Sequence, residues 1–289
     1  MFRVQTIDRL DHPDLLPYRN MRQQLDHHRQ GIFVAEGEKV VRRLLASQLP
    51  VISALFPPQW LGSFEPLLRD RSEEISVFLA EKTVLQELTG FSMYQGVLAL
   101  ARVPTPAKLS EVLKRAARPC LLAAVDGLSS ADNLGGLVRN CVAFGVQALL
   151  IGETSASPYL RRAVRSSMGT IFQLPVVEAA CLAEAIQELR ARGVHCVAAH
   201  PHTNRRILSE GNFAEDCCVV FGSEGNGLSP RVLGACDEPV AIPMEPGVDS
   251  LNVCSASAVV LYEANRQRGS KERSPTSDFT KTEESGQGP

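Results

Sequence analysis

Three polar loops carry the residues of this sequence whose types and spacing could do chemistry. The first loop, residues 126–133, follows the apolar run 120–125 and leads into a helical pattern that contains Arg139. A loop between the C-terminal end of a strand and the start of a helix is where α/β sheets bind ligands. The structural alternative is an ordinary helix start capped by Asp132 or Asn133. Arg139 is either a surface arginine whose aliphatic chain packs on apolar neighbours, or a residue whose planar guanidinium group binds a phosphate.

The second loop, residues 221–230, is rich in glycine. Gly222, Gly225 and Gly227 lie close together, which indicates that a ligand or another backbone segment approaches closely. Neither nucleotide-phosphate pattern is present, because no lysine follows the glycines and G-x-G-x-x-G is not formed. Glu224, in the middle of the loop, would repel phosphates. An adenosine cofactor without phosphates fits better, and S-adenosyl-L-methionine is the common cofactor of that kind.

The third loop, residues 242–253, combines Pro243 and Pro246 with Ser250 and Asn252, just before the last helical pattern. Proline restricts the backbone, so polar side chains at the end of such a loop would be held in place. Ser250 or Asn252 could equally be a plain helix cap. Each loop alone fits a structural role, and only their combination points to a site.

An alternation of strand and helix patterns must position these loops. Apolar runs at 120–125, 146–151, 194–199, 217–221 and 240–242 predict strands. Helical patterns cover 109–117, 134–144, 182–192 and 252–268, and another helix follows Ser229 as its cap and Pro230 at its first position. This order predicts an α/β domain with a mainly parallel sheet covered on both faces.

The first hundred residues predict a second, small α/β domain. Helical patterns cover 17–30, 38–47 and 81–89, and strand patterns cover 32–35, 51–56, 76–79 and 95–101. Two prolines in the segment 103–106 cannot continue a strand interior or a helix, so the boundary between the domains is expected there. The expected division is 1–103, 107–268 and a tail, 269–289, too poor in apolar residues to fold.

Composition excludes several classes of protein. Of the 289 residues 44% are hydrophobic and 21% charged, which is typical of globular chains. Thirty basic against thirty-two acidic residues give a formal charge of −2, so an RNA site would have to be a local patch. No apolar run is long enough for a membrane span and no signal peptide is present, which predicts a cytoplasmic protein. The cysteines form no C-x-x-C pair, so buried thiols are expected and no metal site.

The three loops, in this order, resemble the motifs of the SpoU/TrmH-type RNA 2′-O-ribose methyltransferases of the SPOUT superfamily. The resemblance covers about 107–268 and rests on Asn133-x-Gly135-x-x-x-Arg139, residues 221–228, Ile242-Pro243-Met244 and Ser250-Leu251-Asn252-Val253. Residues 165–169 also resemble an intermediate segment of the family. The first hundred residues resemble, more weakly, the substrate-binding domain of one branch, through 33–37 and 94–97.

This resemblance implies a trefoil knot in the C-terminal domain, an S-adenosyl-L-methionine site formed by the knotted loops, and a homodimer in which both protomers contribute to each active site. Carried over by motif position, the catalytic residues would be Asn133, Arg139, Glu224, Ser250 and Asn252. Cofactor-binding residues would be Gly222, Glu224, Asn226, Ile242, Leu251 and Val253. Cys254 departs from the family, which usually has a serine there.

The expected activity is methylation of a ribose 2′-hydroxyl in ribosomal or transfer RNA, with ribosomal RNA favoured and with neither DNA nor a membrane as partner. The Arg139 position has been assigned the role of general base in the family, but guanidinium groups stay protonated near neutral pH, so we favour a phosphate clamp. Candidate RNA contacts are Arg19, Arg22, Arg29 and Arg165. The alternatives are a non-catalytic RNA-binding protein, a nucleotide-binding enzyme, and a methyltransferase acting on a base nitrogen.

Overall fold

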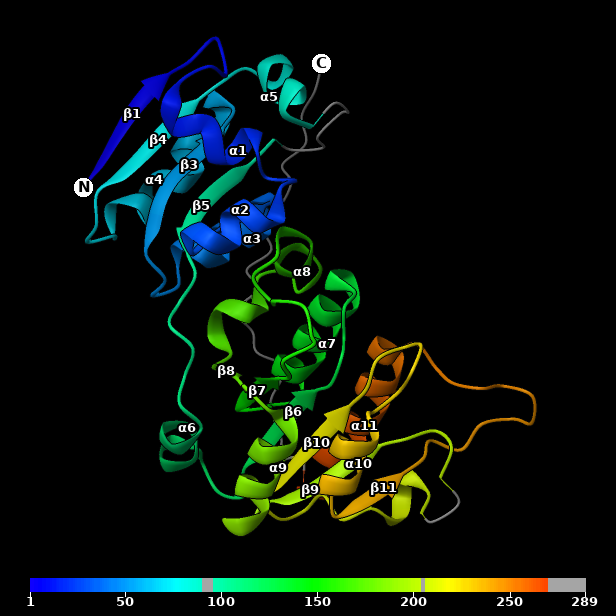
Figure 1. The fold of residues 1–289 in the computed structure, drawn as a ribbon. Helices are drawn as coiled ribbons and strands as arrows, with labels where there is room; N and C mark the ends of the chain where they lie inside the picture. Colours follow the sequence, from blue (N-terminus) through cyan, green and yellow to red (C-terminus); the bar gives the residue numbers. More distant parts are fainter. Residues whose placement is uncertain (90–95, 204–205, 270–289) are drawn as a thin grey trace, which may run out of the picture.

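The computed structural model describes residues 1–89, 96–203 and 206–269. Its strands form two sheets, one from each half of the chain (Figure 1). Most of the predicted tail 269–289 and residues 94 and 95 of the weaker N-terminal motif lie outside the described residues. Within the described residues no helix has the length and apolar character needed to cross a membrane.

The first sheet is mixed, in the order β1-β4-β3-β5-β2. Its strands are β1 (Phe2–Thr6), β2 (Ile32–Glu36), β3 (Val51–Phe56), β4 (Ile75–Leu79) and β5 (Leu98–Arg102). The helices around it are α1 (Leu16–Arg19), α2 (Gln24–Gln30), α3 (Glu38–Leu45), α4 (Leu61–Arg69) and α5 (Lys82–Thr89). The strand β5 pairs antiparallel with β2 and β3, whereas β4 pairs parallel with β1 and β3.

Three features of this first half differ from the sequence prediction. The single helix expected over 17–30 is two helices, α1 and α2, separated by a turn. The strand β1 was not predicted, because it lies at the sheet edge with most of its side chains exposed and so lacks apolar alternation. The helix α4 was not predicted either, since Pro66 lies inside it.

The second sheet has six strands, all parallel, in the order β11-β9-β10-β6-β7-β8. They are β6 (Leu121–Val125), β7 (Ala148–Ile151), β8 (Val176–Glu178), β9 (His195–Ala199), β10 (Cys217–Phe221) and β11 (Glu238–Val240). The helices of this half are α6 (Leu109–Arg115), α7 (Ala131–Ala143), α8 (Arg161–Ser166), α9 (Leu182–Ala191), α10 (Pro230–Ala235) and α11 (Val253–Gln267). The α/β class with a parallel sheet is therefore confirmed.

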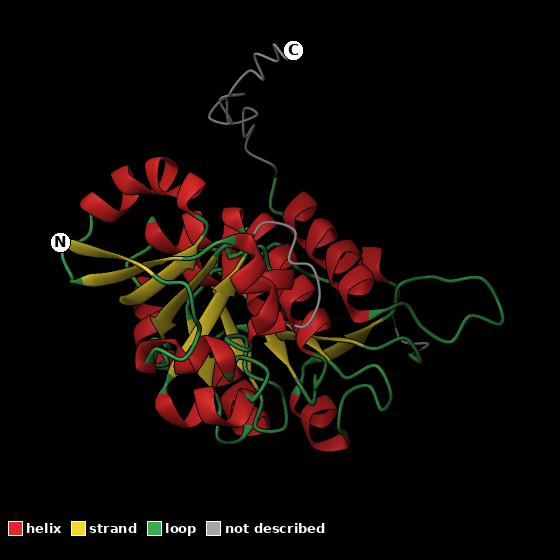
Figure 2. Ribbon diagram, turned by 90° about the horizontal axis from the view of Figure 1, so that it is seen from above, coloured by secondary structure: helices red, strands yellow, loops and turns green. Residues whose placement is uncertain are grey.

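Alternate residues of the buried strands serve the two faces of this sheet. On β6, Leu121 and Ala123 join the core under α7 and α11, whereas Leu122 and Ala124 join the core under α6, α9 and α10. Helices consequently cover both faces (Figure 2). Because all six strands run the same way, the loops after β6, β9, β10 and β11 leave from one edge of the sheet.

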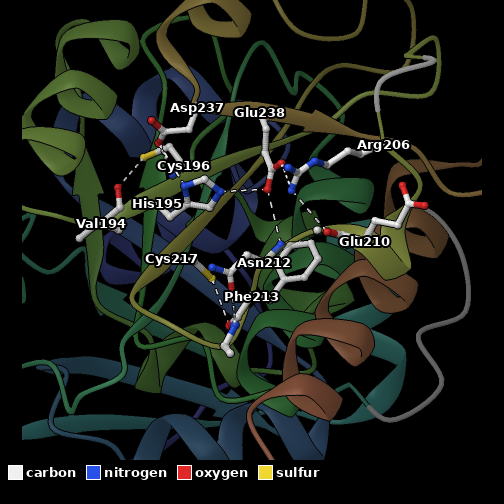
Figure 3. A network of polar contacts seen from close by, with 12 residues as sticks. Val194, His195, Cys196, Arg206, Glu210, Asn212, Phe213, Cys217, Asp237 and Glu238 are labelled. Atoms are coloured by element: carbon white, nitrogen blue, oxygen red, sulfur yellow. Dashed lines mark hydrogen bonds and ion pairs between the residues drawn. The ribbon is translucent and has the colours of Figure 1, made fainter.

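A polar network ties the strand β11 and the segment after residue 205 to the beginning of β9 (Figure 3). The His195 ring contacts Glu238 at 2.9 Å, and the same carboxylate pairs with Arg206 at 2.8 Å. Asp237 accepts from the Cys196 amide at 2.8 Å. These bonds anchor the edge strand.

All eight cysteines are free and five of them are buried, as the sequence predicted. Burial raises the pKa of Cys217 to about 11 and that of Cys236 to about 12. Within the described residues no group of histidine, cysteine and carboxylate side chains has the arrangement of a metal site.

Candidate functional site

Asn133 is the residue at which the three predicted loops meet. It lies in the first turn of α7, whose cap is Ser130, accepting from the Asn133 amide at 3.4 Å. The alternative in which Asp132 or Asn133 caps this helix is therefore wrong. Because Ser130 satisfies the helix end, the Asn133 side chain is available for contacts with the other loops, and its amide donates to the Glu224 carboxylate.

The third loop reaches Asn133 through Asn252 and Cys254. The Asn252 amide nitrogen donates to Asn133 Oδ1 at 3.2 Å, and Asn252 caps α11 by accepting from the Cys254 amide at 2.8 Å. The cap of α11 is thus Asn252 and not Ser250, which is exposed. The Cys254 thiol lies 3.1 Å from the Asn133 carbonyl oxygen, so the thiol at the usual serine position still donates a hydrogen bond to the first loop.

The glycine-rich loop folds tightly on itself. The backbones of Ser223 and Gly227 exchange two hydrogen bonds of 3.0 Å. A Cβ added at Gly222 would lie 2.2 Å from the Gly227 carbonyl carbon and 2.4 Å from the Leu228 nitrogen, both backbone atoms. Only glycine is compatible with this turn. Ser229 caps α10 as predicted, accepting from the Val232 amide.

A pocket of about 180 Å³ opens between these loops. Five of the six residues assigned to the cofactor line it, and the sixth, Ile242, lines an adjoining pocket together with Met244 and Leu251. The five are Gly222, Glu224, Asn226, Leu251 and Val253. Of the residues assigned to catalysis, Ser250 and Glu224 line this pocket. Asn133 donates to Glu224 and Asn252 donates to Asn133, so these two residues lie next to the lining.

The end of β9 and the loop after it also line this pocket, which no sequence pattern predicted. Ala199, His200, Pro201 and His202 contribute to the lining. Their position at the C-terminal end of a parallel strand was the one available signal. The Nδ1 atom of His200 is buried without a hydrogen-bond partner in the described part of the chain. Burial lowers the pKa of His200, and the nearby His202 lowers it further.

This burial predicts a loss of stability in acid. An unfolded histidine titrates near 6.5, whereas the native state keeps His200 neutral to lower pH. As the pH falls below 6.5, the unfolded chain binds a proton at this histidine that the native state does not bind. The free energy of unfolding therefore falls as pH falls. We expect His200→Gln to reduce the drop in melting temperature between pH 7.5 and 5.5, measured by thermal unfolding. An unchanged drop in the variant would contradict this.

Arg139 is not brought together with the other candidate catalytic residues. It lies six residues beyond Asn133 on α7, nearly two helical turns away, with an exposed side chain. Its neighbour Asn140 instead faces α11, donating to the Cys254 carbonyl at 2.8 Å and the Ser257 hydroxyl at 2.9 Å. Arg139 lines neither of the two pockets.

The candidate RNA contacts lie in two places. Arg19, Arg22 and Arg29 are exposed on and beside the helices α1 and α2 of the first half. Arg165 belongs to α8 in the second half and pairs with Glu36 at 3.2 Å, with 62% of its side chain still exposed. The structure thus places Arg165 at the contact between the two halves.

Sequence comparison finds related RNA methyltransferases. A family model described as the SpoU rRNA Methylase family matches residues 121–262. An uncharacterized tRNA/rRNA methyltransferase of Mycobacterium tuberculosis (strain ATCC 25618 / H37Rv) is 34% identical over 246 residues, covering 82% of this chain and 82% of that protein. One from Synechocystis sp. is 30% identical over 274 residues, covering 92% and 95%.

Solved structures resemble the whole fold. The crystal structure of an RNA 2′-O ribose methyltransferase aligns with a TM-score of 0.75 at 26% identity, covering 91% of this chain and 99% of that one. The SpoU methyltransferase AviRb from Streptomyces viridochromogenes, in complex with AdoMet, aligns with a TM-score of 0.77 at 25% identity, covering 90% and 99%. Sequence, fold and the convergence of the three loops agree, and the chain belongs to the SpoU rRNA methylase family.

Proposed function

We propose that this protein is an RNA 2′-O-ribose methyltransferase that uses S-adenosyl-L-methionine, with ribosomal RNA favoured over transfer RNA as substrate. The observation that carries the proposal is the convergence of three loops on Asn133 beside a pocket lined by Gly222. The 2′-O ribose specificity of the structural neighbour and membership of the family support it.

The pocket residues fit S-adenosyl-L-methionine. Gly222 allows the backbone of Gly227 and Leu228 to pack directly against it and so shapes this side of the pocket, and Leu251 and Ile242 offer apolar surface. The described lining of the two pockets includes no lysine or arginine, which suits an adenosine group without phosphates. When bound, the cofactor supplies an electrophilic methyl group on a sulfonium with a neutral leaving group.

The protein's own residues then have to position the ribose. Asn133, Glu224 and Asn252 hold the three loops in one arrangement, and Ser250 presents a hydroxyl at the pocket. Holding the ribose oxygen in line with the methyl carbon supplies much of the rate enhancement in such a displacement. Arg139 clamps the phosphate next to the target ribose, because its planar fork binds phosphate oxygens in pairs.

The exposed position of Arg139 favours a shared active site. Arg139 is exposed and lines neither pocket of its own chain, while α11 next to α7 exposes Val259 (40%) and Tyr262 (60%). We infer a homodimer that forms through the exposed surface of α7 and α11. In this dimer, Arg139 of one protomer binds the RNA phosphate next to the pocket of the other protomer. The trefoil knot expected for residues 107–268 and a cytoplasmic location belong to the same proposal.

The first half, residues 1–103, is assigned to RNA binding in this proposal. Its exposed arginines at positions 19, 22 and 29 would contact phosphates, as would Arg165 across the boundary. Such contacts are electrostatic and recognise RNA by shape and charge.

The experiment that tests the function is product analysis. Purified protein is incubated with labelled S-adenosyl-L-methionine and either ribosomal or transfer RNA, and the labelled RNA is hydrolysed in alkali. We expect label in alkali-resistant dinucleotides, because a 2′-O-methyl group prevents cleavage of the adjacent phosphodiester. Label released as mononucleotides would indicate a base methyltransferase, and RNA binding without methyl transfer would indicate a non-catalytic protein.

A further inference from the structure

The two halves of the molecule meet through an ion-pair cluster at one carboxylate. Glu36, at the end of β2, accepts hydrogen bonds from two arginines of α8, Arg161 and Arg165, the latter at 3.2 Å. The side chains of Glu36 and Arg161 are only 14% and 18% exposed. A charge shielded from water to this extent requires its partners, so removing one of them is costly.

Aromatic packing fixes the same contact. Phe33, on the same strand as Glu36, packs against Tyr159 and Phe172, with ring centroids 5.6 and 5.7 Å apart. At the far end of α8, Arg43 donates to the Met168 carbonyl at 2.6 Å. Met168 has a φ of 55°, a left-handed conformation that costs a non-glycine residue energy and is retained only where its surroundings hold it. The helix α8 is thus held by the first half along its whole length.

The other side of α8 is joined to the start of α7. Arg162 pairs with Asp132, and the Ser166 hydroxyl donates to the same carboxylate at 3.0 Å. A Cβ added at Gly135 would lie 2.4 Å from the Ala163 carbonyl oxygen, so the two helices touch through their backbones. Asp132 immediately precedes Asn133, the residue on which the three loops converge.

We propose that α8 is a rigid link through which the position of the first half sets the position of Asn133, and that Glu36 is a positioning residue for methyl transfer. The inference rests on the proposed function. Glu36 lines neither pocket and acts only through α8 and Asp132. Such a link would make turnover depend on the position of the RNA-binding half relative to the second half. Displacements of about 1 Å at a reacting group can cost about 100-fold in rate.

The test uses Glu36→Gln in the full chain. Glutamine keeps the shape and can still accept from one arginine, but it loses the charge that holds both. We expect kcat for RNA methylation to fall about tenfold, with the KM for RNA and the Kd for S-adenosyl-L-methionine within twofold of wild type. Asp132→Asn, on the other side of α8, should lower kcat similarly, and the double variant should lower it less than the product of the two effects.

The matched control is Glu65→Gln, which removes the partner of Arg69 in an exposed i,i+4 pair of the same half. It should leave every parameter at the wild-type value. If Glu36→Gln does not fold, Arg165→Gln removes only the more exposed partner and should give a smaller loss of kcat, together with the rise in KM for RNA expected from losing a phosphate contact. Wild-type kcat in Glu36→Gln, or a rise in KM alone, would overturn the inference.

A second readout is independent of activity and separates this inference from the proposed function. In hydrogen exchange, the amides at the start of α7 should exchange faster in Glu36→Gln than in Glu65→Gln. Unchanged exchange there overturns the link even if the wild-type enzyme methylates RNA. Faster exchange supports the link, whereas a failure of the proposed function would appear as a wild-type protein without methyl transfer to RNA.

Discussion

We expect Arg139→Ala to lower the turnover of RNA methylation by two orders of magnitude or more, which corresponds to about 3 kcal/mol of transition-state stabilisation. The affinity for S-adenosyl-L-methionine and the melting temperature should stay unchanged, because the side chain is exposed and lines neither pocket. Arg139→Lys should not restore turnover, since an ammonium group cannot reproduce the bidentate geometry of a guanidinium. Single-turnover kinetics together with calorimetry measure both effects.

The control for this variant is Arg192→Ala. Arg192 is a half-exposed arginine that pairs with Glu188 at the end of α9, on the opposite face of the sheet. Its removal should leave methylation unchanged. Wild-type turnover in Arg139→Ala would refute the catalytic assignment and leave Arg139 as an ordinary surface residue.

Gly222→Ala should abolish measurable cofactor binding, a loss of at least 100-fold or about 2.7 kcal/mol. The added Cβ meets the backbone of Gly227 and Leu228 at 2.2 to 2.5 Å, so the turn that lines the pocket has to open. Gly225→Ala is the matched control in the same loop, because a Cβ there has no heavy atom within 4 Å. Titration calorimetry with S-adenosyl-L-methionine compares the two, and equal affinities would contradict the assignment of this pocket to the cofactor.

The two variants together test the shared active site. Mixed dimers of Arg139→Ala and Gly222→Ala protomers contain one complete site if each site takes Arg139 from one chain and the pocket from the other. Part of the activity should then return on mixing. No return in verified mixed dimers would contradict the sharing but not the role of either residue.

The regular elements of the second half were largely predictable from local patterns. The strand β10 occupies the residues predicted for it, and Ser229 and Pro230 begin α10 as expected. Buried parallel strands are continuous apolar runs, and caps and prolines act within a few residues, so a sequence window contains the necessary information. The order of strands and helices then predicted an α/β fold with a parallel sheet.

Elements with weak local signals were missed for the same reason. The helix α8 is six residues long and half of them are arginines, so it has no apolar period to detect. Its arginines pair with Glu36 and Asp132, which lie 125 and 30 residues away in sequence. The strand β8, three residues long, was also not predicted.

By itself the sequence determined the class of fold, the three loops and, through the order of their motifs, the family. Only the tertiary structure decided that Asn133 joins Glu224 and Asn252, which lie 91 and 119 residues further along the chain. It also decided that His200 lines the pocket, that the exposed Arg139 does not, and that Glu36 joins the halves. Local propensity acts over one or two turns of chain, whereas these contacts arise when parallel strands bring distant loops to one edge of a sheet and helices pack across it.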